Sequence, residues 1–278
     1  MQENLTLITL SDTLLVPRAY LFRLRNHLNR GGLCVVPSDT SYALAGIPVI
    51  RDVCRDINKI LNKGDQAVPV TFGTQILAER FVEFSRANLQ LIDEFTPGPI
   101  TIVAPLRSDL PRHQVEALLR ALNKTGNSIG IRFPDSPPEV QISSELERPI
   151  TTSAILYRDG TPVRNFTDAF DIVEEAASRH SIARSVYGIR RPATIAEGGL
   201  STVVETTSSN PRVNSYSIVR QGAVSEKQIR HALAALDRYV ARDVEEWGEF
   251  RQSKHLPLRA RRISRRASSN HGSYGGGR

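Results

Sequence analysis

Small polar side chains follow a short apolar run near the start of the chain. Ser38, Asp39, Thr40 and Ser41 come directly after residues 33–36, which are all apolar. Such a run is typical of a buried strand, and ligands of open α/β sheets bind at the carboxyl ends of strands. Hydroxyl and backbone N–H groups placed there can hydrogen-bond a carboxylate or a phosphate. The alternative is a polar turn that only ends the strand, and the spacing alone favours this simpler interpretation.

Sequence patterns of the common catalytic sites are absent. The chain has no Walker loop, no G-x-G-x-x-G, no H-E-x-x-H and no G-x-S-x-G. Its six histidines lack the spacing of metal ligands, and Cys34 and Cys54 fall where small buried hydrophobic residues are expected. The sequence therefore predicts neither a metal site nor a disulfide framework.

The elements that must position these residues alternate between short apolar runs and helical stretches, which is the pattern of an α/β fold. Strands are predicted at residues 33–36, 68–72, 100–104, 128–133, 150–154, 201–205 and 215–220. Helices are predicted at residues 17–29, 49–60, 75–95 and 115–122, and from residue 225 onward.

The positive charge of the chain is concentrated at its C-terminal end. The sequence has 278 residues, 40% of them hydrophobic, and a formal net charge of +7. Residues 251–278 contain no Asp or Glu, and their Lys and Arg residues account for the whole excess. A segment with one sign of charge and no apolar periodicity is typical of disorder. This tail either binds RNA or anionic lipid, or is a dispensable solubilising end.

The predicted organisation is one domain with appendages. No stretch is apolar for the length of a membrane helix, and the first residues lack the pattern of a signal peptide, so we expect a cytoplasmic protein. The predicted parts are a lead-in with the first helix at 1–30, the domain at 31–236, a helical extension at 237–250 and the basic tail at 251–278.

Six short motifs resemble those of the YrdC/YciO family and occur in the family's order. They are V-P-S-D-T-S-Y-A-L at 36–44, P-G-P-I-T at 97–101, I-G-I-R-F-P at 129–134, P-I-T-T-S-A at 149–154, G-G-L-S-T-V-V at 198–204 and V-R-Q-G-A at 219–223. The resemblance implies an α/β fold in which a twisted mixed sheet with flanking helices surrounds a large concave cavity.

The same resemblance implies a reaction. Family synthases make threonylcarbamoyl-AMP from ATP, with Mg²⁺, L-threonine and bicarbonate, and this product serves the threonylcarbamoyladenosine modification of tRNA. A synthase of this type, or a close relative, is the leading hypothesis. The alternative is a non-catalytic module that binds double-stranded RNA or a nucleotide.

Candidate site residues follow from the motif positions. On the amino-acid side, the resemblance implies that Ser38, Arg132 and Ser201 bind the substrate, and a planar guanidinium suits a carboxylate. On the nucleotide side, the resemblance implies three further contacts. These are Ser128, Ser153 and Arg220.

Two departures from the family pattern weaken the phosphate side. The synthases carry a K-x-R pair for the ATP phosphates, and counting back from Pro69 places these positions at Asn62 and Gly64. Lys63, expected on an exposed loop, is the candidate catalytic replacement for one cation. The asparagine of the family's S-A-N segment is Ile155, which cannot supply amide hydrogen bonds. The chain therefore resembles a divergent, YciO-like member, and we expect slow catalysis.

Overall fold

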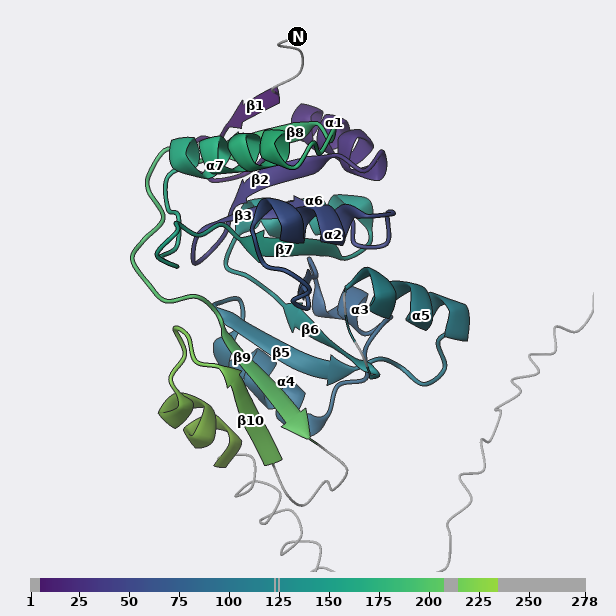
Figure 1. Cartoon of the computed structure of the whole chain (residues 1–278). Coiled ribbons are helices and arrows are strands. Elements are labelled where there is room, and N and C mark those ends of the chain that lie inside the picture. The colour runs from purple at the N-terminus through teal and green to yellow at the C-terminus, as the bar shows by residue number, and fades with distance from the viewer. Residues whose placement is uncertain (1–5, 123, 125, 208–214, 235–278) are drawn as a thin grey trace, which may run out of the picture. The chain divides into compact units, whose positions relative to one another are not determined.

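The short apolar runs of the sequence form a ten-stranded mixed sheet in the computed structural model (Figure 1). The structure describes residues 6–122, 124, 126–207 and 215–234, so the predicted extension at 237–250 and tail at 251–278 lie outside the described residues. The strand order is β1-β8-β2-β3-β7-β4-β6-β5-β9-β10. The pairs β1–β8, β2–β8, β4–β6 and β5–β9 are parallel, and the other neighbours are antiparallel.

The bounds of the elements are as follows. The strands are β1 (Thr6–Thr9), β2 (Leu33–Pro37), β3 (Tyr42–Gly46), β4 (Val70–Thr71), β5 (Ile100–Pro105), β6 (Ser128–Arg132), β7 (Ile150–Ala154), β8 (Val186–Arg190), β9 (Thr202–Thr207) and β10 (Ser215–Arg220). The helices are α1 (Arg18–Asn29), α2 (Val53–Ile60), α3 (Gln75–Ala78), α4 (Arg86–Phe95), α5 (Arg112–Ala121), α6 (Pro137–Leu146) and α7 (Phe166–Arg179), and residues 226–234 are also helical.

Helices cover both faces of the β2–β3–β7 region. Successive side chains of a strand point to opposite faces, so the fully apolar β2 packs on both sides. Leu33 and Val35 belong to one hydrophobic cluster with α2 and α7, whereas Cys34 and Val36 belong to another with α1 and α6. Figure 1 shows α2 and α7 in front of this region and α6 behind it.

A third hydrophobic cluster holds the other half of the sheet. It joins β4, β5 and β6 to α4, α5 and the helical residues 226–234. Arg132 at the end of β6, Thr71 of β4 and Ser153 of β7 belong to strands that pair with one another in the middle of the sheet. The predicted fold class, a twisted mixed sheet with flanking helices, is confirmed.

Several predicted elements are confirmed, and one is wrong. The strands predicted at 150–154 and 215–220 coincide with β7 and β10. The single helix predicted over 75–95 is instead the two helices α3 and α4. They are separate because Ser85 starts α4 through a reciprocal capping box with Asn88.

Five elements were not predicted from the sequence: β1, β3, β8, α6 and α7. The motif loop after β2 returns at once as β3, which pairs with β2 in antiparallel register. Only residues 38–41 therefore remain as the polar turn. No helix within the described ranges is long and apolar enough to cross a membrane.

Candidate functional site

The turn between β2 and β3 joins two of the predicted substrate residues. The Ser38 N–H donates to the Ser41 carbonyl at 2.9 Å and closes the turn. The Ser38 Oγ donates to Asp39 Oδ1 at 3.1 Å, and Arg132 Nη2 donates to the same oxygen at 2.6 Å. Both members of this ion pair are buried, with side-chain exposures of 7% for Arg132 and 6% for Asp39.

Arg132 is only partly used by this ion pair. A guanidinium carries five N–H donors, and the buried Nε of Arg132 has no hydrogen-bond partner in the part of the chain that the structure describes. The sequence predicted Arg132 as a carboxylate ligand but did not reveal that Asp39 shares it. The N–H groups of Arg132 that Asp39 does not use can bind the carboxylate of a ligand, and this carboxylate would then lie next to that of Asp39.

A buried polar row continues from this turn across the sheet. Thr71 of β4 and Thr152 of β7 bring their Oγ1 atoms to 2.9 Å, and Thr71 Oγ1 donates to Glu139 Oε2 of α6 at 3.2 Å. Burial raises the pKa of Glu139, and the charge of Arg132 lowers it in part. Sequence reasoning missed Glu139, because nothing in the sequence around α6 marks a carboxyl that faces inward.

Lys63 reaches the site from the loop that follows α2. Its neighbours Asn62 and Gly64 both have positive φ, 52° and 58°, and its ammonium turns toward β7. The Nζ donates to Ser153 Oγ and to the Ala154 carbonyl, each at 2.8 Å. The expectation of an exposed loop lysine is therefore wrong: the side chain is largely buried because it spans to β7.

The pKa of Lys63 reflects this position. Burial of the ammonium lowers it from 10.5 to about 8, and the charge of Arg220 contributes in the same direction. A buried cation next to another cation is costly for the protein unless an anion binds there.

Arg220 lies at the end of β10 and contacts Ser201. Its Nη2 donates to the Ser201 carbonyl at 2.8 Å and to Ser201 Oγ at 2.9 Å, while Ser201 Oγ lies 3.0 Å from Thr101 Oγ1. Gly222 permits this arrangement, since a Cβ there would lie 2.1 Å from the Leu200 carbonyl oxygen. Arg220 is exposed when the whole residue is considered. Burial of its guanidinium nevertheless lowers the pKa of Arg220, and the charge of Arg132 lowers it further.

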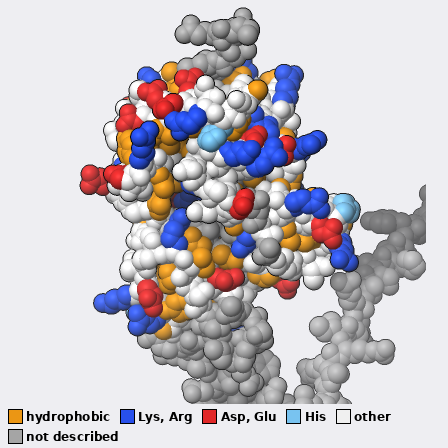
Figure 2. All heavy atoms as spheres, viewed as in Figure 1, with side chains coloured by type: hydrophobic (Ala, Val, Ile, Leu, Met, Phe, Trp, Pro, Cys, Tyr) orange, Lys and Arg blue, Asp and Glu red, His pale blue; other side chains and the backbone are white. Residues whose placement is uncertain are grey.

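Lys63, Arg220 and Arg132 thus form a cluster of three cations. Arg220 depresses the pKa of Lys63, and Arg132 depresses that of Arg220. Only Arg132 has an ion-pair partner among the described residues, and that partner is Asp39. Figure 2 shows Lys and Arg side chains along a hollow between the half that carries α7 and the half that carries β5 and β9. Such a cluster can bind anions.

Two predicted positions lie apart from this cluster. Ser128 is opposite Pro105 at the other end of β6, four residues and so about 13 Å from Arg132. Ile155, at the position of the family asparagine, is fully buried in the cluster formed with α2 and α7. Its N–H donates to the Tyr42 carbonyl at 2.9 Å. An asparagine here would face the hydrophobic core and could not reach a ligand.

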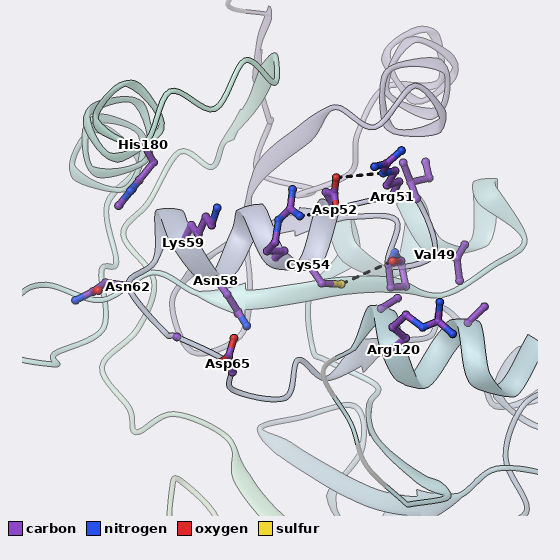
Figure 3. Close-up of a pocket in the computed structure, with 16 residues that line it drawn as sticks. Val49, Arg51, Asp52, Cys54, Asn58, Lys59, Asn62, Asp65, Arg120 and His180 are labelled. Carbon is purple, nitrogen blue, oxygen red and sulfur yellow. Dashed lines mark hydrogen bonds and ion pairs between the residues drawn. The ribbon is translucent and has the colours of Figure 1, made fainter.

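Two large cavities of the structure are lined mostly by residues outside this cluster. A cavity of about 690 Å³ lies between α2 and α5, and none of the seven predicted site residues lines it. Figure 3 shows Lys59 of α2 and Arg120 of α5 among its walls. A second cavity of about 1320 Å³, walled by α7 and residues 156–160, reaches Lys63. No group of three or more His, Cys, Asp or Glu that could hold a metal ion occurs in the described ranges.

Comparisons with known proteins agree with the fold. Two structures of Sua5 from P. abyssi are similar: a double variant (TM-score 0.63, 16% identity, 82% of this chain and 60% of that chain) and a complex with L-threonine (TM-score 0.61, 16% identity, 83% and 61%). E. coli YciO is also similar (TM-score 0.61, 18% identity, 82% and 100%). The chain thus spans about 60% of Sua5. No curated protein matches it significantly.

The sequence of the chain matches a family directly. Residues 26–222 match the Sua5/YciO/YrdC family, described as "Telomere recombination". The match covers well over half of the chain and includes β2 to β10, with every predicted site residue. The chain therefore belongs to the Sua5/YciO/YrdC family.

Proposed function

We propose that the chain is an ATP-dependent nucleotidyltransferase of the threonylcarbamoyl-AMP synthase type that serves tRNA modification in the cytoplasm. L-threonine and bicarbonate give a carbamate with loss of water. A carbamate oxygen then attacks the α-phosphorus of ATP, and the bond to the β-phosphate oxygen breaks to release pyrophosphate. The cluster of Lys63, Arg220 and Arg132 carries this proposal, because ATP and the carbamate of threonine are both anions and the reaction needs positive charge rather than a protein nucleophile.

The cations divide the work in this proposal. Lys63 with Ser153, and Arg220 nearby, hold the phosphates, since Nζ already points at the Ser153 hydroxyl. Ser128, farther along β6, contacts the nucleoside end. Mg²⁺ bound to ATP would neutralise phosphate charge there.

The amino acid lies at the other end of the cluster. Arg132 binds the threonine carboxylate through the donors that Asp39 leaves free, and Ser38 and Ser201 bind its polar groups. The Sua5 structure with L-threonine supports this choice of amino acid through the shared fold.

A non-catalytic module is the second candidate. Asn62 and Gly64 replace the cation pair of the synthases, which favours a chain that binds a nucleotide or double-stranded RNA without turning over. Binding needs only the basic cluster, whereas catalysis needs it aligned with the transition state.

One experiment separates these candidates. The full chain is incubated with ATP, Mg²⁺, bicarbonate and L-threonine, and pyrophosphate and the adenylate are measured, with bicarbonate or threonine omitted as controls. We expect slow pyrophosphate release that requires both omitted components. Binding of ATP without such release would favour the module, and the absence of both would show that the cation cluster is not the site.

A further inference from the structure

A fully buried carboxyl lies beneath the proposed amino-acid site and has no role in the reaction described above. Glu139 is in the first turn of α6 and is 0% exposed. Ser136 fixes this helix end: its Oγ donates to the Pro37 carbonyl at 2.7 Å and accepts from the Glu139 N–H at 3.4 Å. The start of α6 is thereby attached to the end of β2, which brings Glu139 under the Ser38 turn.

The surroundings of Glu139 leave one of its oxygens unused. Oε2 accepts from Thr71 Oγ1 at 3.2 Å, whereas buried Oε1 has no partner among the residues described. The charged groups that face it are Arg132 of β6 and Asp39 of the turn, and the hydroxyls of Ser38 and Thr71 also face it and partly offset the rise of its pKa. The Nε of Arg132 is likewise buried and without a partner.

These two unused groups, together with the burial of Glu139, point to a neutral carboxyl. An ionised Glu139 next to a guanidinium would form a charge-assisted hydrogen bond, as Asp39 does. Instead burial raises the pKa of Glu139, and among the described residues Asp39 is the one ion-pair partner of Arg132. With a neutral Glu139, Arg132 faces one carboxylate and can accept a second from a ligand. With an ionised Glu139, Arg132 would already face two carboxylates, those of Asp39 and Glu139.

We propose that Glu139 is a positioning residue of the amino-acid site: as a neutral carboxyl it leaves the Arg132 guanidinium free for a ligand carboxylate, and as a carboxylate it binds that guanidinium itself. The proposal rests on the proposed function for the identity of the ligand, an α-amino acid. Its sign is fixed: affinity for the ligand is highest below the pKa of Glu139 and falls as the pH rises through it.

Calorimetric titration with L-threonine at a series of pH values tests this. For the wild-type chain we expect affinity to fall by up to about tenfold per pH unit above the pKa of Glu139. Glu139→Gln, which stays neutral, should keep the low-pH affinity of the wild type and lose this slope. Titration of the threonine amine contributes equally to both proteins. Glu145→Gln is the matched control, since it removes a carboxylate of α6 that pairs with Arg25, and it should keep the wild-type slope.

A structural role alone would not produce a pH slope that glutamine removes. If Glu139→Gln retains the slope of the wild type, the proposal is wrong. A loss of threonine affinity in Glu139→Gln at every pH would also overturn it, because the neutral side chain is then insufficient.

A second measurement does not need threonine. The Nε–H resonance of Arg132 in a ¹⁵N-labelled chain, assigned by its loss in Arg132→Lys, should shift as Glu139 ionises in the wild type and stay fixed in Glu139→Gln. A titrating resonance without threonine binding at any pH would refute the proposed substrate and support the role of Glu139. A resonance that does not titrate in the wild type would refute that role.

Discussion

Replacement of Lys63 by methionine separates anion binding from stability. Methionine keeps a long apolar stem and removes the ammonium, which donates to Ser153 Oγ and the Ala154 carbonyl. Hydrogen bonds from a charged group contribute about 1.5–3 kcal/mol each, so their loss costs about 3–6 kcal/mol. Against this, lowering the pKa from 10.5 to about 8 means that the charged form is disfavoured by about 3 kcal/mol. We therefore expect Lys63→Met to lower the free energy of unfolding by at most about 3 kcal/mol.

The effect on anion binding has no such compensation. Loss of one charge-assisted contact to a phosphate, at about 1.5–3 kcal/mol, lowers affinity by about 10- to 100-fold. Isothermal titration with pyrophosphate near neutral pH measures this loss. In the wild type, affinity should also fall as the pH rises past about 8, because Lys63 then loses its proton. Lys63→Met should show little of this dependence.

The same pKa fixes the sign of the pH dependence of folding. Between about 8 and 10.5 the unfolded chain holds a proton on Lys63 that the folded chain has lost, so the free energy of unfolding rises with pH in this window. Urea unfolding across the window should show the rise in the wild type and not in Lys63→Met.

Lys59→Met is the matched control for this pair of experiments. Lys59 is exposed on α2 and lines the cavity between α2 and α5 (Figure 3). Lys59 carries the same charge as Lys63 and lies four residues before it, but it does not contact Ser153. We expect wild-type affinity for pyrophosphate. Equal losses in both variants would mean a nonspecific charge effect, and wild-type binding by Lys63→Met would refute the assignment of Lys63 to the phosphates.

Three further predictions concern the departures from the family pattern. Ile155→Asn should lower the free energy of unfolding in urea by about 3 kcal/mol, because it buries an amide in an apolar cluster, and a gain in turnover would contradict this placement. Gly64→Arg should cost about 1 kcal/mol of stability at φ 58° yet raise pyrophosphate affinity. Gly64→Gln shares the backbone cost without the charge, so equal affinities in the two would refute the charge argument. Deletion of residues 251–278 should weaken RNA binding and its salt dependence while the melting temperature stays nearly unchanged. An unchanged salt slope would place RNA on the folded part.

Local sequence signals were sufficient for one strand at the centre of the sheet and one at its edge. Residues 150–154 and 215–220 are rich in β-branched or aromatic side chains with clear ends, and they form β7 and β10. A signal for α7 also existed and was overlooked: Phe166, Ala169 and Phe170 begin a helical apolar spacing behind the capping residue Asn165.

Other features of the site depend on contacts between distant residues. The inward position of Glu139 follows from Ser136 meeting Pro37, which lies 99 positions earlier in the chain. Likewise, the sequence predicts that a lysine on a loop is exposed. The backbone conformation at Asn62 and Gly64, together with the contact to β7, is what buries Lys63. The motif positions identified which residues to examine, but the partners that set their charge and exposure come from the tertiary fold.

The distribution of charge reverses one expectation about the two ends of the site. From the sequence, the amino-acid side with Ser38, Arg132 and Ser201 is closer to the family pattern than the phosphate side. Yet Asp39 already neutralises Arg132, whereas within the described residues Lys63 and Arg220 donate only to uncharged oxygens. The uncompensated charge therefore lies toward the proposed nucleotide end. A polyphosphate gains most from it, so ATP should bind more tightly than the amino acid.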